Sequence, residues 1–355
     1  MDTWSSKRVI EDLDSPNFIA KHHCHRCSQT TPSLLVEKFI RPCSRESHLF
    51  LHPHPDDDDS HEGVYSMNIR EIMGMKIQVI NMLACINGKI CVGGFFVDGF
   101  QGFVLWNPAT KESKVVSYPT SDCQAMCAFG YDHNSNDYKV VWFVYHSVHV
   151  YKLSTESWTQ LVNTAIHVSK IISINRFEVI YLNGVHHWVG FMNNGDINEL
   201  GGDWDPQVIV CFDMSHEVFR VIRFPDDVFQ RLRYLELVDV STMEKTLAVL
   251  NDCLAFIVYN DESTLTEKFF DIWVIREYGV EDSWTKQLVV GPLLGIKEPL
   301  GFARNGELLL RGGDEAIVLY NIDSQEMKNL QCGGFPSTAM IYVESIVSFP
   351  SGNLS

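Results

Sequence analysis

The side chains best suited to chemistry gather near the N-terminus, in two short clusters of histidine, cysteine and aspartate. The first cluster, residues 22–27, contains a Cys-x-x-Cys pair, Cys24 and Cys27, together with three histidines. These side chains can bind zinc, but a structural zinc site needs four ligands, which usually come as two separated pairs. No second Cys-x-x-Cys follows, and the His-x-x-x-His pair His48 and His52 begins 21 residues after Cys27, within the second cluster. We therefore expect a solvated linker here rather than a metal site.

The second cluster surrounds four consecutive aspartates at residues 56–59. Four histidines flank it, namely His48, His52, His54 and His61. The segment could attract a divalent cation weakly, but it lacks the glycine turn and the distal glutamate of a calcium loop. Elsewhere the chain contains no Gly-x-Ser-x-Gly, no P-loop and no dinucleotide fingerprint. The residues therefore predict neither a catalytic site nor a bound metal or cofactor.

Composition restricts the partners of these 355 residues. Hydrophobic residues make up 45% of the chain, which predicts a folded protein with a sizeable core. A formal net charge of −17 disfavours nucleic acid and anionic membrane as main partners, because both select surfaces rich in Lys and Arg. No stretch is apolar for long enough to span a membrane, and the N-terminus lacks the apolar run of a signal peptide. Ten cysteines without an export signal predict reduced thiols, and hence a location in cytoplasm or nucleus.

A degraded repeat forms the framework that must position any site. An apolar strand, a polar turn of Asn, Asp, Ser, Thr or Pro, and a second strand recur along the chain. The clearest copies are residues 104–116, 148–158, 209–222 and 317–328. Repetition of one hairpin at long spacing indicates a radial or solenoid architecture, in which each unit buries its apolar face against its neighbours.

The strand candidates fall into groups of about four. Asn-Gly pairs at residues 87–88, 183–184 and 305–306 separate apolar runs, which is a strong hairpin signal. Five groups cover residues 82–119, 125–162, 178–225, 246–290 and 299–330. A last strand at 341–347 would leave an open edge by itself. We therefore expect it to join candidates at 49–52, 64–69 and 76–80 in a sixth group.

The resulting prediction is an all-β, β-propeller-like domain over residues 33–350, with about six four-stranded blades closed by the N- and C-terminal strands. The alternative is an open double-sheet β-sandwich. Residues 1–32 lack the repeat, and Ser15 followed by Pro16 predicts a short helical turn there. His186 and His187 should lie on opposite faces of one strand, with one of them packed. Aromatic residues recur with the strands, so most should pack between blades: Trp106, Tyr151, Trp158, Trp188, Trp273 and Trp284.

The order of the motifs resembles a known family, the plant F-box-associated domain proteins, often called F-box/kelch-repeat proteins. Each motif is weak alone, but together they span about 240 residues in the family's order. The longest match covers residues 270–280 and 283–286, from Phe270-Asp271-Ile272 to Trp284-Thr285-Lys286. The other matches are residues 105–110, 129–132, 137–141, 150–158, 182–188, 212–219, 299–302 and 342–347.

The resemblance implies a substrate-recognition propeller behind an F-box, a helical module that docks onto a Skp-type adaptor and so onto a cullin ubiquitin ligase. Residues 4–6 and 14–22 look like the last third of an F-box, so residues 1–32 are interpreted as an F-box remnant and linker. The preceding helices, with their Leu-Pro start, are absent from this sequence. We therefore expect the chain to bind the adaptor weakly or not at all.

The functional hypothesis is a non-catalytic adaptor that presents an unknown protein substrate to the ligase. Two alternatives remain open: a propeller-fold enzyme, either a hydrolase or an oxidase, and a substrate-binding protein uncoupled from the ligase. Candidate binding residues lie in two insertions, 193–207 and 226–243, because irregular loops on a repeat scaffold commonly carry binding. They are Trp204, Asp205, Phe229, Arg231 and Arg233. The two insertions could equally be tolerated loops without a function.

Overall fold

The computed structural model describes residues 33–39, 47–52, 65–67, 77–96, 101–119, 126–144, 147–162, 171–192, 207–225, 228, 243–260, 266–303, 305–330 and 335–350. These residues form six four-stranded sheets, and every strand pairing whose register is determined is antiparallel. A single turn of 3₁₀ helix, η3 (Glu281–Ser283), lies between two of the strands. No helix among the described residues is long and apolar enough to cross a membrane.

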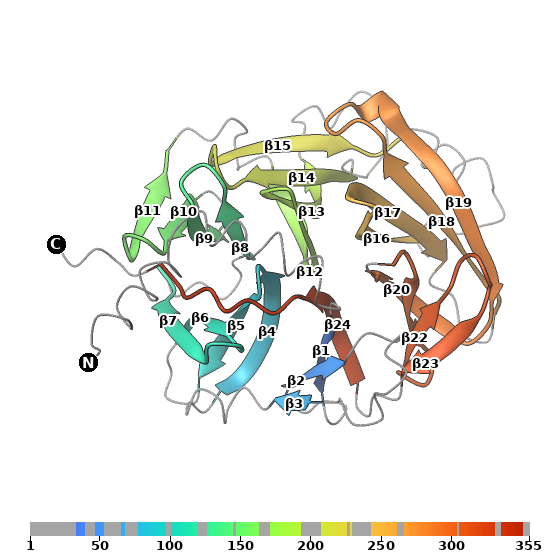
Figure 1. Cartoon of the computed structure of the whole chain (residues 1–355). Coiled ribbons are helices and arrows are strands. Elements are labelled where there is room, and N and C mark those ends of the chain that lie inside the picture. The colour runs from blue at the N-terminus through green and yellow to red at the C-terminus, as the bar shows by residue number, and fades with distance from the viewer. Residues whose placement is uncertain are drawn as a thin grey trace, which may run out of the picture. The chain divides into compact units, whose positions relative to one another are not determined.

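The chain divides into two compact units. Unit 1 comprises Met1–Ser121, Leu153–Ser157 and Ser337–Ser355. Its first sheet has the order β24-β1-β2-β3 (Figure 1), with β24 Phe335–Tyr342, β1 Ser33–Phe39, β2 Ser47–His52 and β3 Tyr65–Met67. Its second sheet runs β4 Ile77–Ile86, β5 Lys89–Phe96, β6 Gln101–Asn107 and β7 Glu112–Ser117.

Unit 2 comprises Asp122–Lys152 and Trp158–Pro336 and holds four sheets, each built from strands consecutive in sequence. The first contains β8 Met126–Asp132, β9 Asp137–Val144, β10 Ser147–Lys152 and β11 Ser157–Leu161. The second contains β12 Ile171–Leu182, β13 Val185–Met192, β14 Gln207–Asp213 and β15 Val218–Arg223. The third contains β16 Met243–Leu250, β17 Cys253–Asn260, β18 Lys268–Ile275 and β19 Trp284–Leu293. The fourth contains β20 Ile296–Phe302, β21 Leu308–Gly312, β22 Ile317–Tyr320 and β23 Met327–Leu330.

Apolar side chains fill the spaces between successive sheets of unit 2. One cluster lies between β8–β11 and β12–β15, a second between β12–β15 and β16–β19, and a third between β16–β19 and β20–β23. Phe212, Phe256 and Phe270 are fully buried members of these clusters. Burial of each such ring stabilises the fold by about 1.5–3 kcal/mol. A strand with neighbours on both faces, such as β17, is therefore apolar along nearly its whole length, whereas β19 alternates buried and exposed positions.

Repeated four-stranded meanders with apolar faces on both sides are the blades of a β-propeller. The predicted all-β propeller fold is confirmed, and the β-sandwich alternative is wrong. The predicted aromatic packing is also confirmed, because Trp106, Tyr151, Trp188 and Trp284 are buried and Trp158 and Trp273 are half-buried. The helical remnant predicted within residues 1–32 lies outside the described residues.

Two details of the predicted sixth group are wrong. The C-terminal strand that pairs with β1 is β24, Phe335–Tyr342, and not residues 341–347. Residues 76–80 belong largely to β4 of the next sheet rather than to the shared sheet. The shared sheet itself is confirmed, since it joins β24 to β1, β2 and β3.

Residues 343–350 form an extended segment against the β4–β7 sheet, which we call the C-terminal strap (Figure 1, red). The Asn107 side-chain amide donates to the carbonyls of Ser345 and Val347, at 3.0 Å each. The buried Lys89 ammonium also donates to Val347 O, at 3.0 Å. Gly88 has φ +72°, and a Cβ there would lie 2.6 Å from the Ser345 Cβ. Side chains thus occupy the strap carbonyls that a β-ladder would need, which explains why the strand ends at Tyr342.

Candidate interaction surface

The structure locates the attachment points of the two predicted binding loops. Trp204, Asp205, Phe229, Arg231 and Arg233 all lie outside the described residues, so their role stays a prediction. The strands beside them are described, and Phe191 pairs with Gln207 while Val208 pairs with Arg223. The end of β13, the start of β14 and the end of β15 therefore lie side by side. Both predicted loops thus leave the β12–β15 sheet from the same end of its strands.

The second loop ends at the start of β16, and β16 contacts the same end of the β12–β15 sheet. Lys245 Nζ donates to Gln207 Oε1 at 2.8 Å. The same ammonium lies 6.0 Å from the centre of the Phe224 ring, within the range of a cation–π contact. The attachment points of both loops are thus fixed by contacts between β16 and the β12–β15 sheet.

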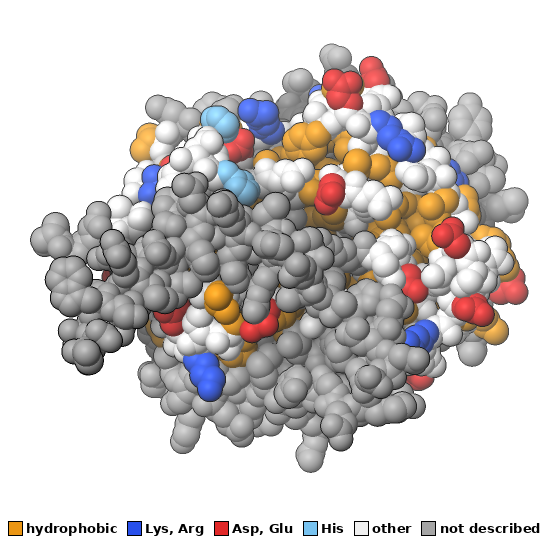
Figure 2. Space-filling view, in the orientation of Figure 1, with side chains coloured by type: hydrophobic (Ala, Val, Ile, Leu, Met, Phe, Trp, Pro, Cys, Tyr) orange, Lys and Arg blue, Asp and Glu red, His pale blue; other side chains and the backbone are white. Residues whose placement is uncertain are grey.

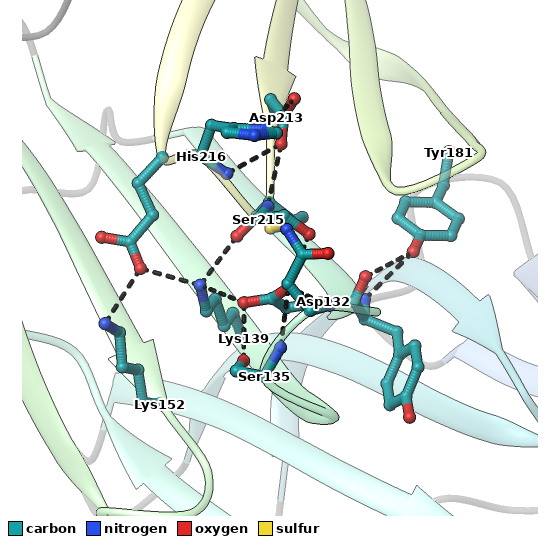
Figure 3. A network of polar contacts seen from close by, with 12 residues as sticks. Asp132, Ser135, Lys139, Lys152, Tyr181, Asp213, Ser215 and His216 are labelled. Atoms are coloured by element: carbon teal, nitrogen blue, oxygen red, sulfur yellow. Dashed lines mark hydrogen bonds and ion pairs between the residues drawn. The ribbon is translucent and has the colours of Figure 1, made fainter.

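A buried network of charges joins this sheet to the β8–β11 sheet (Figure 3). Lys139 Nζ contacts Asp132 Oδ2 at 2.7 Å, Glu217 Oε1 at 2.8 Å and the Met214 carbonyl at 2.7 Å. Three acceptors satisfy the three N–H groups of the ammonium. Asp132 also accepts hydrogen bonds from the hydroxyls of Ser135 and Ser215. The Lys139 and Asp132 side chains are each only 3% exposed.

The environment of this network keeps both main partners charged. Burial raises the pKa of Asp132, but the hydrogen bonds from Lys139, Ser135 and Ser215 outweigh it and hold the pKa well below its usual range. Burial lowers the pKa of Lys139, but the carboxylates of Asp132 and Glu217 outweigh burial and raise that pKa above its usual value. A buried and internally satisfied network can stabilise a junction but offers nothing to a ligand. No group of three metal-binding side chains is placed to hold an ion in the described part of the chain.

The junction between β12–β15 and β16–β19 is built differently, around the connection from β18 to β19. We call residues 276–283 the Tyr278 loop. The Tyr278 hydroxyl lies 2.7 Å from His187 Nε2, while His187 Nδ1 lies 3.3 Å from the Ile180 carbonyl. Because a carbonyl can only accept, Nδ1 carries the proton and Tyr278 donates to Nε2. Burial lowers the pKa of His187 to about 4, so the ring is neutral at pH 7.

Both histidines of the pair are buried, and the expectation that only one is packed is wrong. Neighbouring sheets cover both faces of β13, so side chains on both faces are shielded from solvent. His186 Nε2 lies 2.8 Å from the Phe129 carbonyl in the β8–β11 sheet, whereas His187 contacts the Tyr278 loop. The two rings therefore link β13 to opposite neighbours.

Further contacts hold the Tyr278 loop in one shape. Glu281 Oε1 accepts the Arg223 backbone N–H at 2.8 Å, and its carboxylate lies 3.6 Å from the Arg223 guanidinium. The Trp284 indole N–H donates to the Arg223 carbonyl at 3.0 Å. Gly279 has φ +84°, a conformation that other residues adopt only with strain. The loop is thus preorganised by contacts at both ends and at its turn.

This loop exposes the kinds of side chain that anchor protein interfaces. Tyr278 is 47% exposed and Val280 is 40% exposed, and the side chain of Arg223 is 78% exposed beside them. A fixed aromatic residue and an arginine are common hot-spot residues, because little entropy is lost when they bind. Figure 2 shows apolar side chains gathered over the sheets β12–β15 and β16–β19, with isolated charges among them. Tyr278, Val280, Arg223 and Glu281 define the candidate interaction surface.

Sequence reasoning missed this surface. Tyr278 and Val280 belong to the longest family motif, but the binding residues were expected in the two insertions instead. A usable signal was present, since the connection between β18 and β19 is longer than a two-residue turn and holds Tyr-Gly-Val. Arg223 is the last residue of β15 and lies three residues before the second insertion, so the surface adjoins the end of the sheet from which both predicted loops leave.

These sheets and this surface define a β-propeller domain whose best candidate site is an exposed loop rather than a polar pocket. The chain belongs to the family described as the F-box associated β-propeller domain, whose sequence profile matches residues 61–348. It is 25% identical over 380 residues to F-box protein CPR1 of Arabidopsis thaliana, covering 99% of this chain and 84% of that protein. It is 26% identical over 246 residues to an Arabidopsis thaliana F-box/kelch-repeat protein, covering 66% of this chain and 59% of the relative.

Solved structures show only a loose likeness. A putative 6-phosphogluconolactonase from Bacteroides fragilis aligns with 88% of this chain and 98% of its own, at 10% identity and a TM-score of 0.44. At that level the likeness says nothing about what the present chain binds.

Proposed function

We propose that this chain is the substrate-recognition subunit of a Skp–cullin–F-box ubiquitin ligase. Membership of the F-box associated β-propeller family supports the proposal, and so do relatives that are themselves F-box proteins. In this role the propeller binds a protein target, and no residue of the chain makes or breaks a bond. Its contribution is positional, because holding a target near the charged ubiquitin-conjugating enzyme raises the effective concentration of target lysines.

The observation that carries the proposal is the Tyr278 loop. An aromatic ring that is half exposed, with its hydroxyl fixed on a buried histidine, is arranged to contact a partner rather than to stabilise a core. The adaptor and the cullin would be reached through an F-box, and residues 4–6 and 14–22 are the part of this chain that resembles one. The cytoplasm or the nucleus is the compartment that fits this role.

The test uses two exposed valines of almost equal accessibility. Val280, at 40%, lies on the Tyr278 loop, and Val115, at 39%, lies on β7 of unit 1. Tagged full-length chains carrying Tyr278→Ala with Val280→Asp, or Val115→Asp alone, are used to capture partners from the native tissue with and without proteasome inhibition. We expect the loop variant to lose the partners that accumulate under inhibition, and Val115→Asp to retain them.

Retention of every such partner by a loop variant that melts like the parent would exclude this surface. Coupling to the ligase is measured separately, by titrating the full chain with a Skp-type adaptor in a calorimeter. A complex in that titration supports the ligase role. Its absence, together with retained target capture, would favour the alternative of a binding protein uncoupled from the ligase.

A further inference from the structure

The last strand of the β16–β19 sheet is unusual among the strands that end the six sheets. β19 has 10 residues, whereas β3, β7, β11, β15 and β23 have 3, 6, 5, 6 and 4. Among the described strands it pairs with β18 on one side only. Its other side presents backbone N–H and C=O groups from Trp284 to Gly291. The register shifts at Gln287 and again at Gly291 and Pro292, where the proline has no N–H. Such an edge is a template on which another strand can pair.

Proteins usually protect sheet edges with short strands and charged side chains. β15 carries Arg220 and Arg223, and β7 carries Glu112 and Lys114, whereas β3 and β11 carry no charge but have only 3 and 5 residues. β19 has a single charged residue, Lys286, and its ammonium lies 2.5 Å from Asp271 of β18. The charge of β19 is thus neutralised within its own sheet. This edge is long and close to electrically neutral.

Exposed apolar side chains concentrate beside this edge. Five of the nine large apolar side chains found exposed in the described residues lie between residues 269 and 294. Two belong to the Tyr278 loop, and the other three are Phe269 at 52%, Val289 at 51% and Leu294 at 61%. A register shift lies between Lys268 and Phe270, and a Cβ on Gly291 would stand 3.2 Å from the Phe269 ring. Phe269 falls within the register shift, and the missing side chain at Gly291 leaves room for its ring, which stays exposed to solvent.

We infer that β19 binds an extended, mostly uncharged segment of a partner protein, which adds a fifth strand to the β16–β19 sheet. Backbone hydrogen bonds along the edge hold the segment, and its alternate side chains distinguish one partner from another. Thr285, Gln287 and Val289 are exposed at every second position, so the matching face of the segment follows the same period. Apolar residues near one end of the segment contact Val289 and Phe269. The inference rests on the proposed function for the identity of the partner as a ligase target.

The neutral edge selects the chemistry of the segment. A charged side chain opposite β19 would lose water without gaining a partner, because Lys286 is already paired with Asp271. The adjoining Tyr278 loop then contacts the same partner beyond the strand, since β19 begins at Trp284 directly after η3. A target with one exposed strand-forming segment would thus contact both features.

The test is selection from a displayed library of random linear peptides of about twelve residues, slightly longer than β19. The full chain is the bait, and the variant Gln287→Lys with Val289→Lys, which places two charges on the edge, removes peptides that bind elsewhere. Val115→Lys on β7 is the matched control. We expect enriched peptides with apolar residues at alternate positions and few charges. Synthetic copies should protect β19 amides from hydrogen exchange and bind the edge variant about tenfold more weakly or worse.

Enrichment of peptides that bind the edge variant as well as the parent would overturn the inference, as would the absence of any enrichment. Because both substituted side chains are exposed, the edge variant should melt like the parent; if it does not, the single Val289→Lys variant replaces it. The two proposals fail separately. Capture of targets that depends on Tyr278 but not on β19 refutes only the strand addition, whereas peptide binding to β19 without captured targets refutes only the ligase role.

Discussion

The β12–β15 sheet has two neighbours in unit 2, and it is joined to them in opposite ways. Toward β8–β11 it uses charges that are hidden, with Lys139 and Asp132 each 3% exposed. Toward β16–β19 it uses the Tyr278 loop, whose central ring is 47% exposed. In the first junction these charged groups pair with one another, so they hold the two sheets together and are not available to bind a partner. The second leaves an anchored aromatic ring in solvent, which is the condition for recognition.

The comparison also explains why two family motifs of similar prominence differ in role. The motif at residues 129–132 and 137–141 supplies Asp132 and Lys139, which are structural. The motif at residues 270–286 supplies Tyr278 and Val280, which reach solvent. Burial and partners, rather than the presence of a motif, distinguish a residue that stabilises the fold from one that can contact a target.

The largest loss of stability should come from breaking the buried junction between the β8–β11 and β12–β15 sheets, which contains Lys139 and Asp132. Lys139→Met leaves the Asp132 carboxylate buried without its cation, which should lower the free energy of unfolding by about 3–5 kcal/mol. Lys152→Met is the matched control, because Lys152 contacts the same Glu217 at 3.0 Å but is 36% exposed. That control should change stability by about 0.5 kcal/mol or less. Urea unfolding of both variants measures the difference, and equal losses would show that burial does not govern the network.

Acid should weaken the same junction. The folded pKa of Asp132 is held below its unfolded value, so the unfolded chain takes up the proton first. The stabilisation is complete above the ordinary pKa of an aspartate and is lost as the pH falls through the depressed folded value. Unfolding free energies measured from pH 6 downward should therefore fall. In Asp132→Asn the fall should be shallower; an unchanged slope would assign it to other carboxylates.

The hydroxyl groups of two tyrosines give a finer comparison. Tyr181 at the hidden junction accepts from the Tyr131 N–H at 3.2 Å and donates to the Tyr131 carbonyl at 2.8 Å. Tyr181→Phe should lower the free energy of unfolding by about 1–3 kcal/mol, because it leaves backbone groups unpaired. Tyr278→Phe should cost less, about 1 kcal/mol, because it leaves one buried acceptor unpaired, His187 Nε2, rather than two groups. Thermal or urea melts of the two variants test this order, and the reverse order would make the Tyr278 loop the stronger junction.

Local signals predicted the hairpins well. Asn87 and Asn183 adopt φ of 51° and 50°, and the glycines after them are also left-handed, as a tight two-residue turn requires. Such turns depend on adjacent residues only, so the sequence reveals them. The end of β24 was misplaced because Lys89 and Asn107, more than 200 residues earlier, compete for the strap carbonyls. No local pattern encodes that competition.

The candidate site shows the same limit. Tyr278 is fixed by His187, which lies 91 residues away in sequence, and its exposure follows from how two sheets meet. The two insertions were recognisable from their composition, and the structure adds that both leave the same end of one sheet. The roles of Trp204 and Arg231 stay predictions, because those residues lie outside the described ranges.

The strap and β24 have a consequence for how the protein is made. Synthesis proceeds from the N-terminus, so β1 leaves the ribosome about 300 residues before β24, its partner in the finished sheet. Until β24 and the strap emerge, β1 keeps an open edge, and the carbonyls that Lys89 and Asn107 bind do not yet exist. Open strand edges on nascent chains invite aggregation and chaperone binding. Unit 1 can therefore be completed only after β24 and the strap have been synthesised, so its first sheet stays open while the sheets of unit 2 are made.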